Sequence, residues 1–263
     1  MAQTILVFAP HPDDAEFYAG GTLAKMADEG ADIILVTVTS GNKGTFEYDA
    51  VKLAEFRAEE ASKAGAVLGA KEVLFLGFAD YELDRLPAGE LRRHFIRLIR
   101  QYRPDAIFAF DPLGDNLCHP DHREVGRAAW EACSTAHLPL QYPEQLQEGL
   151  KPYFVPEKYY YGDDIRLMNR FFNIDATFGR KMEALAEHKT QVIFLVDEIL
   201  LQAKQAGLPA EALGGQSHFD LLTRAMRQTA SEIGKAAGCQ LAEGFRYVRY
   251  NELVEKILEE KHE

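Results

Sequence analysis

Two short clusters of histidine and aspartate carry the side chains of this sequence that are suited to chemistry. The first is His11-Pro-Asp-Asp14, directly behind the apolar run Ile5–Ala9, and the second is His119-Pro-Asp-His122, behind the apolar run Ala106–Phe110. A catalytic zinc site usually takes three ligands from histidine, aspartate and glutamate and leaves a fourth position for water. The two clusters together supply such a set, so we predict one metal site that they share.

The spacing within the clusters suggests how the ligands are arranged. Where the first strand ends the chain turns, so His11 and Asp14 can face a common centre while the carboxylate of Asp13 stands beside it. The second cluster repeats the spacing, and either His119 or His122 completes the ligand set while the other remains for proton or charge chemistry. In the alternative without a metal, an aspartate only caps the following helix and each His-Pro pair only forms a turn. The presence of both clusters behind buried strands favours the metal site.

The elements that must position these clusters alternate between strand and helix. Such alternation predicts an α/β fold, a Rossmann-like parallel sheet with helices on both faces, in which the carboxyl ends of the strands share one edge. Glycines at 30, 65 and 69 and Pro104 agree with helix ends. The expected strands are Ile5–Ala9, Ile33–Val38, Val73–Leu76 and Ala106–Phe110, and the expected helices are residues 19–30, 50–68 and 88–102.

The second half of the chain has a less regular pattern. A fourth helix is expected from Asp121 or His122 to about Thr135, and 137–156 is expected to be a long loop or lid near the site. We expect this half to pack on the sheet, giving a single α/β domain over residues 1–263 with its core motifs in 1–135. The further elements expected are short strands at Tyr159–Tyr161 and Phe171–Ile174 and helices at Phe178–His188, Val192–Ala206 and Phe219–Ala237.

Composition excludes several classes of function. The net charge of −12, from 41 acidic and 29 basic residues, would repel nucleic acid. No stretch approaches the roughly 18 apolar residues that a membrane span needs, and the N-terminus lacks the features of a secretory signal. Three widely spaced cysteines imply no disulfide framework. We therefore expect a cytoplasmic protein without nucleic-acid or membrane partners.

The first turn after a strand also argues against a dinucleotide site. It reads Pro10-His-Pro-Asp-Asp14 where a Gly-x-Gly-x-x-Gly sequence would be needed. The carboxylates of Asp13, Asp14 and Glu16 would repel a pyrophosphate.

Several sequence motifs resemble one known family. The sequence closely resembles the PIG-L/LmbE-like family of zinc-dependent de-N-acetylases over roughly residues 3–135. A weaker similarity at His188–Gln191 and Ala242–Arg246 looks most like the diacetylchitobiose deacetylase branch. The motifs that carry the resemblance are Ala9-Pro-His-Pro-Asp-Asp-Ala-Glu16, Gly20-Gly-Thr-Leu23, Val38-Thr-Ser-Gly41, Arg57-Ala-Glu-Glu60 with Leu68-Gly69, and His119-Pro-Asp-His122.

The resemblance implies hydrolysis of the acetamide of an N-acetylglucosamine-type sugar, with release of acetate. His11, Asp14 and His122 match the family's zinc ligands, which decides between the two histidines of the second cluster. A site of two histidines and one aspartate also accepts Fe²⁺, Co²⁺ or Mn²⁺. The branch resembled forms hexamers built from trimers, which implies a homo-oligomer, either a trimer or a hexamer.

The resemblance also assigns the remaining catalytic roles. Asp13 matches the general base, and His119 with Asp121 matches the pair that stabilises the oxyanion; we expect the carboxylate of Asp121 to favour the imidazolium form of His119. Arg57 and Asp80 match positions at which relatives hold sugar hydroxyls.

One position departs from the family pattern. Thiol-pathway relatives have a mobile tyrosine two residues before the first histidine of the second cluster, where this chain has Leu117. Tyr48 or Tyr81 would have to take that role from another loop.

Two other functions remain open. One is a deacetylase or amidase of the bacillithiol or mycothiol type, against which Leu117 speaks mildly. The other is a non-catalytic sugar- or nucleotide-binding protein. Acetate release from a panel of N-acetylated sugars, with and without a chelator, separates them.

Overall fold

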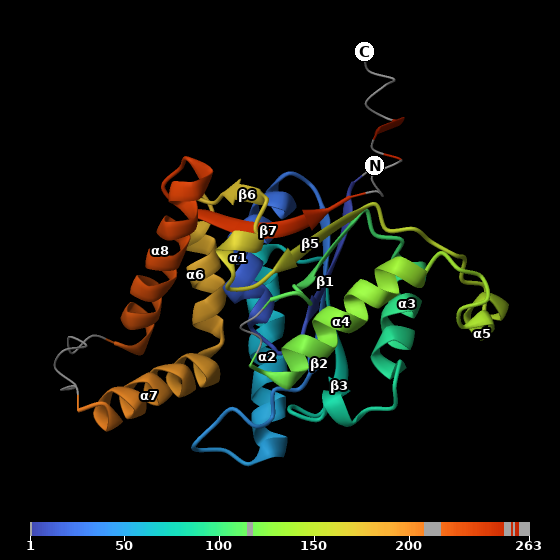
Figure 1. Ribbon diagram of the computed structural model, residues 1–263. Coiled ribbons are helices and arrows are strands. Elements are labelled where there is room, and N and C mark those ends of the chain that lie inside the picture. Colours follow the sequence, from blue (N-terminus) through green and yellow to red (C-terminus); the bar gives the residue numbers. More distant parts are fainter. Residues whose placement is uncertain (1, 115–117, 208–216, 250–253, 255, 258–263) are drawn as a thin grey trace.

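A mixed sheet forms the centre of the molecule. The computed structural model describes residues 2–114, 118–207, 217–249, 254, 256 and 257. Within these ranges the sheet has seven strands in the order β3-β2-β1-β4-β5-β7-β6 (Figure 1). β7 pairs antiparallel with β5 and with β6, and the other pairs are parallel. The strands are β1 (Thr4–Ala9), β2 (Asp32–Thr39), β3 (Glu72–Phe78), β4 (Ala106–Phe110), β5 (Glu157–Tyr161), β6 (Arg170–Asn173) and β7 (Ala242–Val248).

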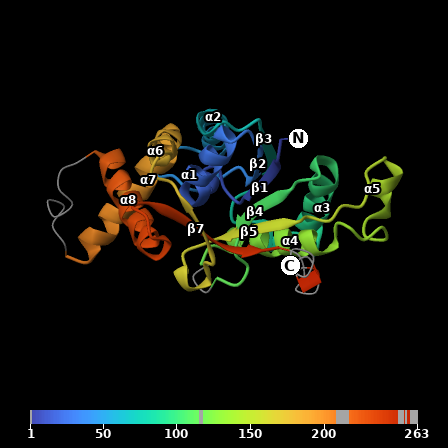
Figure 2. The same ribbon diagram turned by 90° about the horizontal axis from the view of Figure 1, so that it is seen from above.

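Helices cover both faces of the parallel part of the sheet. The residues of β1 show why, because Ile5 and Val7 join the apolar cluster beneath α1, whereas Leu6 and Phe8 join the one beneath α3 and α4. A strand covered on both sides must be apolar on both sides, which confirms the expected α/β class. The helices are α1 (Asp14–Asp28) and α2 (Ala50–Leu68) on one face and α3 (Glu90–Tyr102) and α4 (Pro120–Thr135) on the other (Figure 2).

The order of the strands brings the two clusters together. β1 lies between β2 and β4 and is in register with β4, with Leu6 opposite Ile107. The chain therefore leaves β1 towards one edge of the sheet and later returns to its other side. Ligands of open α/β sheets bind at such a point, beyond the carboxyl ends of the strands.

The second half of the chain extends this sheet and adds helices. α6 packs against α1 and α2, and α7 packs against α8. A Cβ atom on Gly21 would lie 2.8 Å from Ile174, so the absence of a side chain there permits the close approach of the second half to α1. A single domain over 1–263 stays a prediction. The helices are α5 (Pro143–Gln147), α6 (Phe178–Glu187), α7 (Lys189–Gln205) and α8 (His218–Ala237), with 3₁₀ turns at Leu83–Arg85 and Ile165–Leu167.

A buried ion pair joins β7 to α6, and its carboxylate also contacts α1. Lys181 of α6 lies 2.6 Å from Glu243 of β7, and both side chains are buried. Glu243 also accepts hydrogen bonds from the backbone N–H groups of Gly21 (3.0 Å) and Thr22 (2.7 Å).

Among the described residues, no helix combines the length and the apolar character that crossing a membrane requires.

Some boundaries differ from those expected. α1 begins at Asp14 rather than at residue 19, because its first turn carries acidic residues, which favour a helix N-terminus but hide the apolar period. Gly65 lies inside α2 and not at its end. A glycine is needed there for another reason, because a Cβ atom would lie 2.6 Å from Val73. The expected loop 137–156 contains α5, and β7 was not expected as a strand.

Candidate metal centre and catalytic site

Three side chains of the two clusters meet around a common point. His11 Nδ1 lies 3.1 Å from Asp14 Oδ2 and 3.1 Å from His122 Nε2, and His122 Nε2 lies 3.4 Å from Asp14 Oδ1. Ligands about 2.0–2.1 Å from a tetrahedral zinc ion lie about 3.3 Å from one another. The two imidazole nitrogens and the two oxygens of the Asp14 carboxylate thus lie at the spacing of ligands that share a small cation.

Local structure holds these three ligands in place. His11 follows β1, and its backbone N–H donates to the Asp14 carboxylate at 2.8 Å, which closes the turn into α1. His122 lies in the first turn of α4, and its ring stacks on Phe110 at the end of β4, with ring centroids 4.0 Å apart. Two adjacent strand ends and two helix N-termini therefore build the site.

The second ring nitrogen of His11 faces two carboxylates. Nε2 lies 3.1 Å from Asp80 Oδ1 and 3.5 Å from Asp121 Oδ2. Asp121 is completely buried and accepts from the backbone N–H groups of Tyr81 (2.8 Å) and Leu83 (3.3 Å). A proton on Nε2 shared with Asp80 leaves the Nδ1 lone pair free, as in the carboxylate–histidine pairs that orient metal ligands.

The charges of the cluster fit a cation. Burial raises the pKa of Asp14, but His122 and His11 lower it more, so the pKa lies below its usual value. Burial lowers the pKa of His11, yet Asp14, Asp121 and Asp80 raise it well above the usual value. Several buried carboxylates thus surround one imidazole and compete for positive charge, which a divalent ion would supply.

Asp13 stands beside the ligands and is held by Arg57. Arg57 Nη2 lies 3.1 Å from Asp13 Oδ2 and donates to the Pro12 carbonyl at 2.8 Å, while Nη1 donates to the Gly41 carbonyl at 2.9 Å. The φ angle of Asp13 is 144°, a conformation that costs about 1–3 kcal/mol outside glycine and persists at functional sites. Burial, opposed by Arg57 and reinforced by Asp14, raises the pKa of Asp13 to about 6.

His119 differs from the sequence-based expectation in its charge. Burial, together with His11 and His122, lowers its pKa to about 4, so the ring is neutral near pH 7 and not an imidazolium. Its Nδ1 accepts the backbone N–H of Asp121 at 3.2 Å. Its Nε2 is therefore the protonated nitrogen and can donate a hydrogen bond. The Asp121 carboxylate raises this pKa only in part, and it also contacts His11 and the backbone N–H groups of Tyr81 and Leu83 in the loop after β3.

Arg57 and Asp80, predicted to hold sugar hydroxyls, both reach the cavity wall but make other contacts. Arg57 is 2% exposed and Asp80 is 3% exposed, and their bonds are to Asp13, backbone carbonyls and His11. The contact with sugar stays a prediction. The position of Leu117 lies outside the described residues. Of the two tyrosines considered in its place, Tyr81 lies beside His119, with ring centroids 4.0 Å apart.

A buried histidine lies close to Asp13. His188 is completely buried, its Nε2 lies 3.6 Å from Glu16 Oε2, and neither ring nitrogen has a hydrogen-bond partner within the described ranges. Burial lowers the pKa of His188, but Glu16 and Asp13 raise it above the usual value. The weak similarity at His188–Gln191 was the sequence signal for this environment.

These groups open onto a cavity of about 780 Å³. Its lining includes the metal-site residues His11, Asp14 and His122 and residues of α7 and α8. Asp121, in contrast, is not part of the lining. The reactive groups thus share one large cavity with the faces of two helices.

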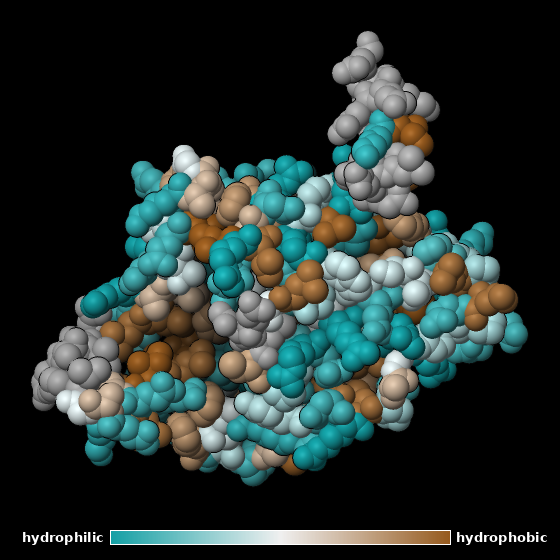
Figure 3. Space-filling model, viewed as in Figure 1, coloured by the Kyte–Doolittle hydropathy of each residue, from teal (hydrophilic) through white to brown (hydrophobic). Residues whose placement is uncertain are grey.

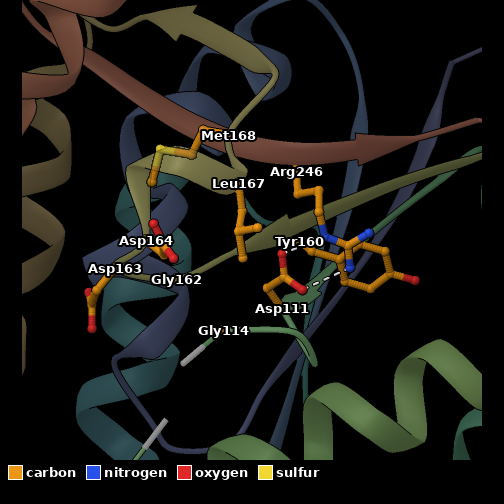
Figure 4. A pocket seen from close by; sticks show the side chains of 9 residues that line it. All are labelled: Asp111, Gly114, Tyr160, Gly162, Asp163, Asp164, Leu167, Met168 and Arg246. Carbon is orange, nitrogen blue, oxygen red and sulfur yellow. Dashed lines mark hydrogen bonds and ion pairs between the residues drawn. The ribbon is translucent and has the colours of Figure 1, made fainter. Parts of the chain in front are cut away.

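A second, smaller pocket adjoins the loop that carries the second cluster (Figure 4). Arg246 of β7 pairs with Asp111, directly after β4, through Nε (2.6 Å) and Nη2 (2.8 Å). The guanidinium also lies 4.8 Å from the ring centroids of Trp130 and Tyr160. A two-pronged, partly buried pair of this kind fixes the point from which the chain runs on to His119. Its sequence signal was again only a weak similarity, at Ala242–Arg246.

Comparisons with known proteins agree with this geometry. Residues 6–133 match the family model PIG-L, described as GlcNAc-PI de-N-acetylase. The diacetylchitobiose deacetylase of Thermococcus kodakarensis is 30% identical over 93% of this chain and 82% of its own. A 1D-myo-inositol 2-acetamido-2-deoxy-alpha-D-glucopyranoside deacetylase of Catenulispora acidiphila is 30% identical over 54% of this chain and 52% of its own. The structure of N,N'-diacetylchitobiose deacetylase from Pyrococcus horikoshii superposes with a TM-score of 0.79 at 28% identity, covering 94% of this chain and 84% of that one.

Proposed function

Because this chain belongs to the PIG-L family of hydrolytic de-N-acetylases, we propose that it removes the acetyl group from an N-acetylglucosamine-type sugar by metal-dependent hydrolysis. The observation that carries the proposal is the triangle of His11, Asp14 and His122 with the carboxylate of Asp13 beside it. Three ligands and an adjacent general base are what hydrolysis of an unactivated amide requires.

The ligand set favours zinc, with Fe²⁺, Co²⁺ or Mn²⁺ as other ions that it accepts. Two other groups of donor atoms lie within 4.8 Å of one another, one from His11, His119 and His122 and one from His11, Asp80, His119 and Asp121. We favour the set of His11, Asp14 and His122 because its three contacts are at most 3.4 Å, whereas His119 Nε2 is 3.8 Å from Asp80 Oδ1. When bound, the cation would supply Lewis acidity towards water and the amide carbonyl.

The chain's own residues then have separable tasks. Asp13, with a pKa of about 6, is mostly ionised at neutral pH and takes the proton of the attacking water. Arg57 holds that carboxylate in place through its contact at 3.1 Å. His119 directs an Nε2–H group towards the oxyanion that develops on the amide oxygen. The proton on Asp13 passes to the leaving amine, and acetate and the free amino sugar depart.

A substrate panel tests this proposal. Acetate release is measured from N-acetylglucosamine, diacetylchitobiose, N-acetylglucosaminyl malate and N-acetylglucosaminyl inositol, with and without a chelator. Asp13→Asn is the matched control, since it keeps the size of the side chain and removes the base. We expect release from at least one sugar, lost with the chelator and with Asp13→Asn. Bound metal without release from any member favours a sugar-binding protein without catalytic activity.

The thiol-pathway alternative rests on relatives that include the Catenulispora acidiphila enzyme. A clear preference for the malate or inositol conjugate over diacetylchitobiose would support it. The cytoplasmic location and the assembly into a trimer or hexamer also remain predictions, and light scattering coupled to size-exclusion chromatography measures the assembly directly.

A further inference from the structure

The cavity is larger than the proposed sugar. Its volume is about 780 Å³. Even at the roughly 30 Å³ that a water molecule occupies in the liquid, the about 15 non-hydrogen atoms of N-acetylglucosamine would fill only about 450 Å³. Space for a second chemical group therefore remains beyond the sugar.

One face of α7 and one face of α8 contribute to the lining of the cavity. Residues of α7 line it at positions 191, 194, 195 and 198, and residues of α8 line it at 226, 229, 230 and 233, with Glu232 beside this set. Both sets have the i, i+3, i+4, i+7 spacing of one helix face. Each helix thus presents a continuous stripe, which we call the α7–α8 wall.

The α7–α8 wall combines apolar and polar side chains. Its apolar members are Phe194, Leu195, Met226, Ala230 and Ile233, and its polar members are Gln191, Glu198, Thr229 and Glu232. Figure 3 shows hydrophobic side chains gathered in the hollow between α8 and α7. Phe194, Leu195, Met226 and Ile233 are only partly buried although they line the cavity. Covering such side chains with an apolar group of a ligand stabilises the complex, because apolar surface is removed from water.

One polar group of the wall has no partner. Gln191 lies in the first turn of α7, one turn before Phe194, and is 8% exposed. Its Oε1 has no hydrogen-bond partner within the described ranges, although the side chain lines the cavity. A buried amide group without a partner is unfavourable, so a hydroxyl or amide of a ligand is expected to satisfy it. Gln191 therefore offers a polar contact beside the apolar residues of the wall.

We propose that the substrate is an N-acetylated amino sugar joined to an apolar aglycone, and that the aglycone lies against the α7–α8 wall. This inference rests on the proposed function and specifies its substrate class. The sugar occupies the end with His11 and Asp13, and Gln191 binds a polar group near the junction. An alkyl or aryl group then covers Phe194, Leu195, Met226 and Ile233.

A series of alkyl glycosides measures this directly. The probes are methyl, butyl, hexyl and octyl β-glycosides of N-acetylglucosamine, below the concentrations at which they form micelles, with diacetylchitobiose as a polar extension. Each buried methylene corresponds to about fourfold in binding. We expect kcat/KM to rise by about two- to fourfold per methylene until the wall is covered, and the longer glycosides to exceed diacetylchitobiose.

Matched variants localise the effect. Phe194→Ser should reduce the octyl-to-methyl ratio of kcat/KM by about tenfold. Ile199→Ser changes an exposed residue of the same helix that does not line the cavity, and should leave the ratio as it is. If Phe194→Ser does not fold, Ile233→Thr on α8 tests the same wall.

The outcomes separate the two proposals. Acetate release from the methyl glycoside with no dependence on chain length overturns the inference and leaves the proposed function standing. A flat series in which Phe194→Ser breaks an oligomer, seen by light scattering, also overturns it and assigns the wall to a second copy of the chain. No release from any glycoside by metal-loaded protein overturns the proposed function and the inference with it.

Discussion

Asp80 separates two roles that the sequence and the structure assign differently. The family resemblance places Asp80 on a sugar hydroxyl, whereas in the structure its Oδ1 lies 3.1 Å from His11 Nε2 and its side chain is almost completely buried. Asp80→Asn removes the charge but keeps an oxygen that can accept from Nε2. The substitution therefore weakens the orientation of His11 without opening a cavity.

The expected magnitude follows from this contact. Loss of a carboxylate that orients a histidine ligand typically costs about 10- to 100-fold in metal affinity, or about 1.4–2.7 kcal/mol. Asp80 also raises the pKa of His11, after the larger effects of burial, Asp14 and Asp121, and so contributes to the electron density at the ring. We expect the zinc affinity of Asp80→Asn to fall within that range.

Competition with a zinc-binding dye measures the affinity, and elemental analysis after dialysis measures the occupancy. Glu82→Gln is the control, because this partly exposed carboxylate lies in the same loop and pairs with Lys43 and Arg85 rather than with the site. An Asp80→Asn protein that binds zinc as tightly as the wild type, but has a raised KM, would refute the orienting role and restore the role in sugar binding.

Three further predictions follow from the geometry. kcat/KM should rise with pH through a value at or below about 6 and then level off, because ionised Asp13 is the active form and a bound cation lowers its pKa further; a pH–rate profile checks this, and a limb well above 6 would contradict it. His119→Ala should lower kcat by about two to three orders of magnitude with unchanged metal content, measured by kinetics and elemental analysis. Gly21→Ala should destabilise the fold by about 1–3 kcal/mol because the new Cβ would lie 2.8 Å from Ile174, while Gly179→Ala, which meets nothing within 4 Å, should not; thermal unfolding compares the two.

The parallel part of the sheet was predictable from the sequence. β1 and β4 are covered on both faces, so their residues are apolar throughout and stand out against the polar clusters that follow them. The rule that strand ends share an edge then places the clusters together, and the observed register of β1 with β4 supports that step. The apolar pattern of each strand and the rule for strand ends were therefore sufficient to predict this part of the fold.

The antiparallel strand β7 could not be predicted from the sequence pattern, and the reason is physical. It carries Glu243 and Arg246 in a largely buried strand, which reads as a polar segment. Their charges are compensated by Lys181 and Asp111, which come from distant parts of the chain. No local pattern reveals a charge that a remote partner neutralises.

The same limit applies to His119 and Asp121. Their closeness in sequence suggests a charged pair, but burial, His11 and His122 lower the pKa of His119 more than Asp121 raises it, and the Asp121 carboxylate accepts from the backbone N–H groups of Tyr81 and Leu83. The N–H group of Asp121 instead fixes the ring through Nδ1. Which groups lie in the site follows from the sequence, whereas their protonation depends on contacts made by other segments.

The reactive groups and the α7–α8 wall come from different kinds of segment. The ligands and the base come from two short segments at strand ends, where a change in one residue alters the chemistry itself. The α7–α8 wall comes from helix faces whose composition is that of an ordinary amphipathic helix, so nothing in its sequence distinguishes a substrate wall from a packed core. The wall can therefore change residue by residue while the metal triangle stays intact. Substrate preference in such a fold is expected to vary with the second half of the chain, and reaction type with the first.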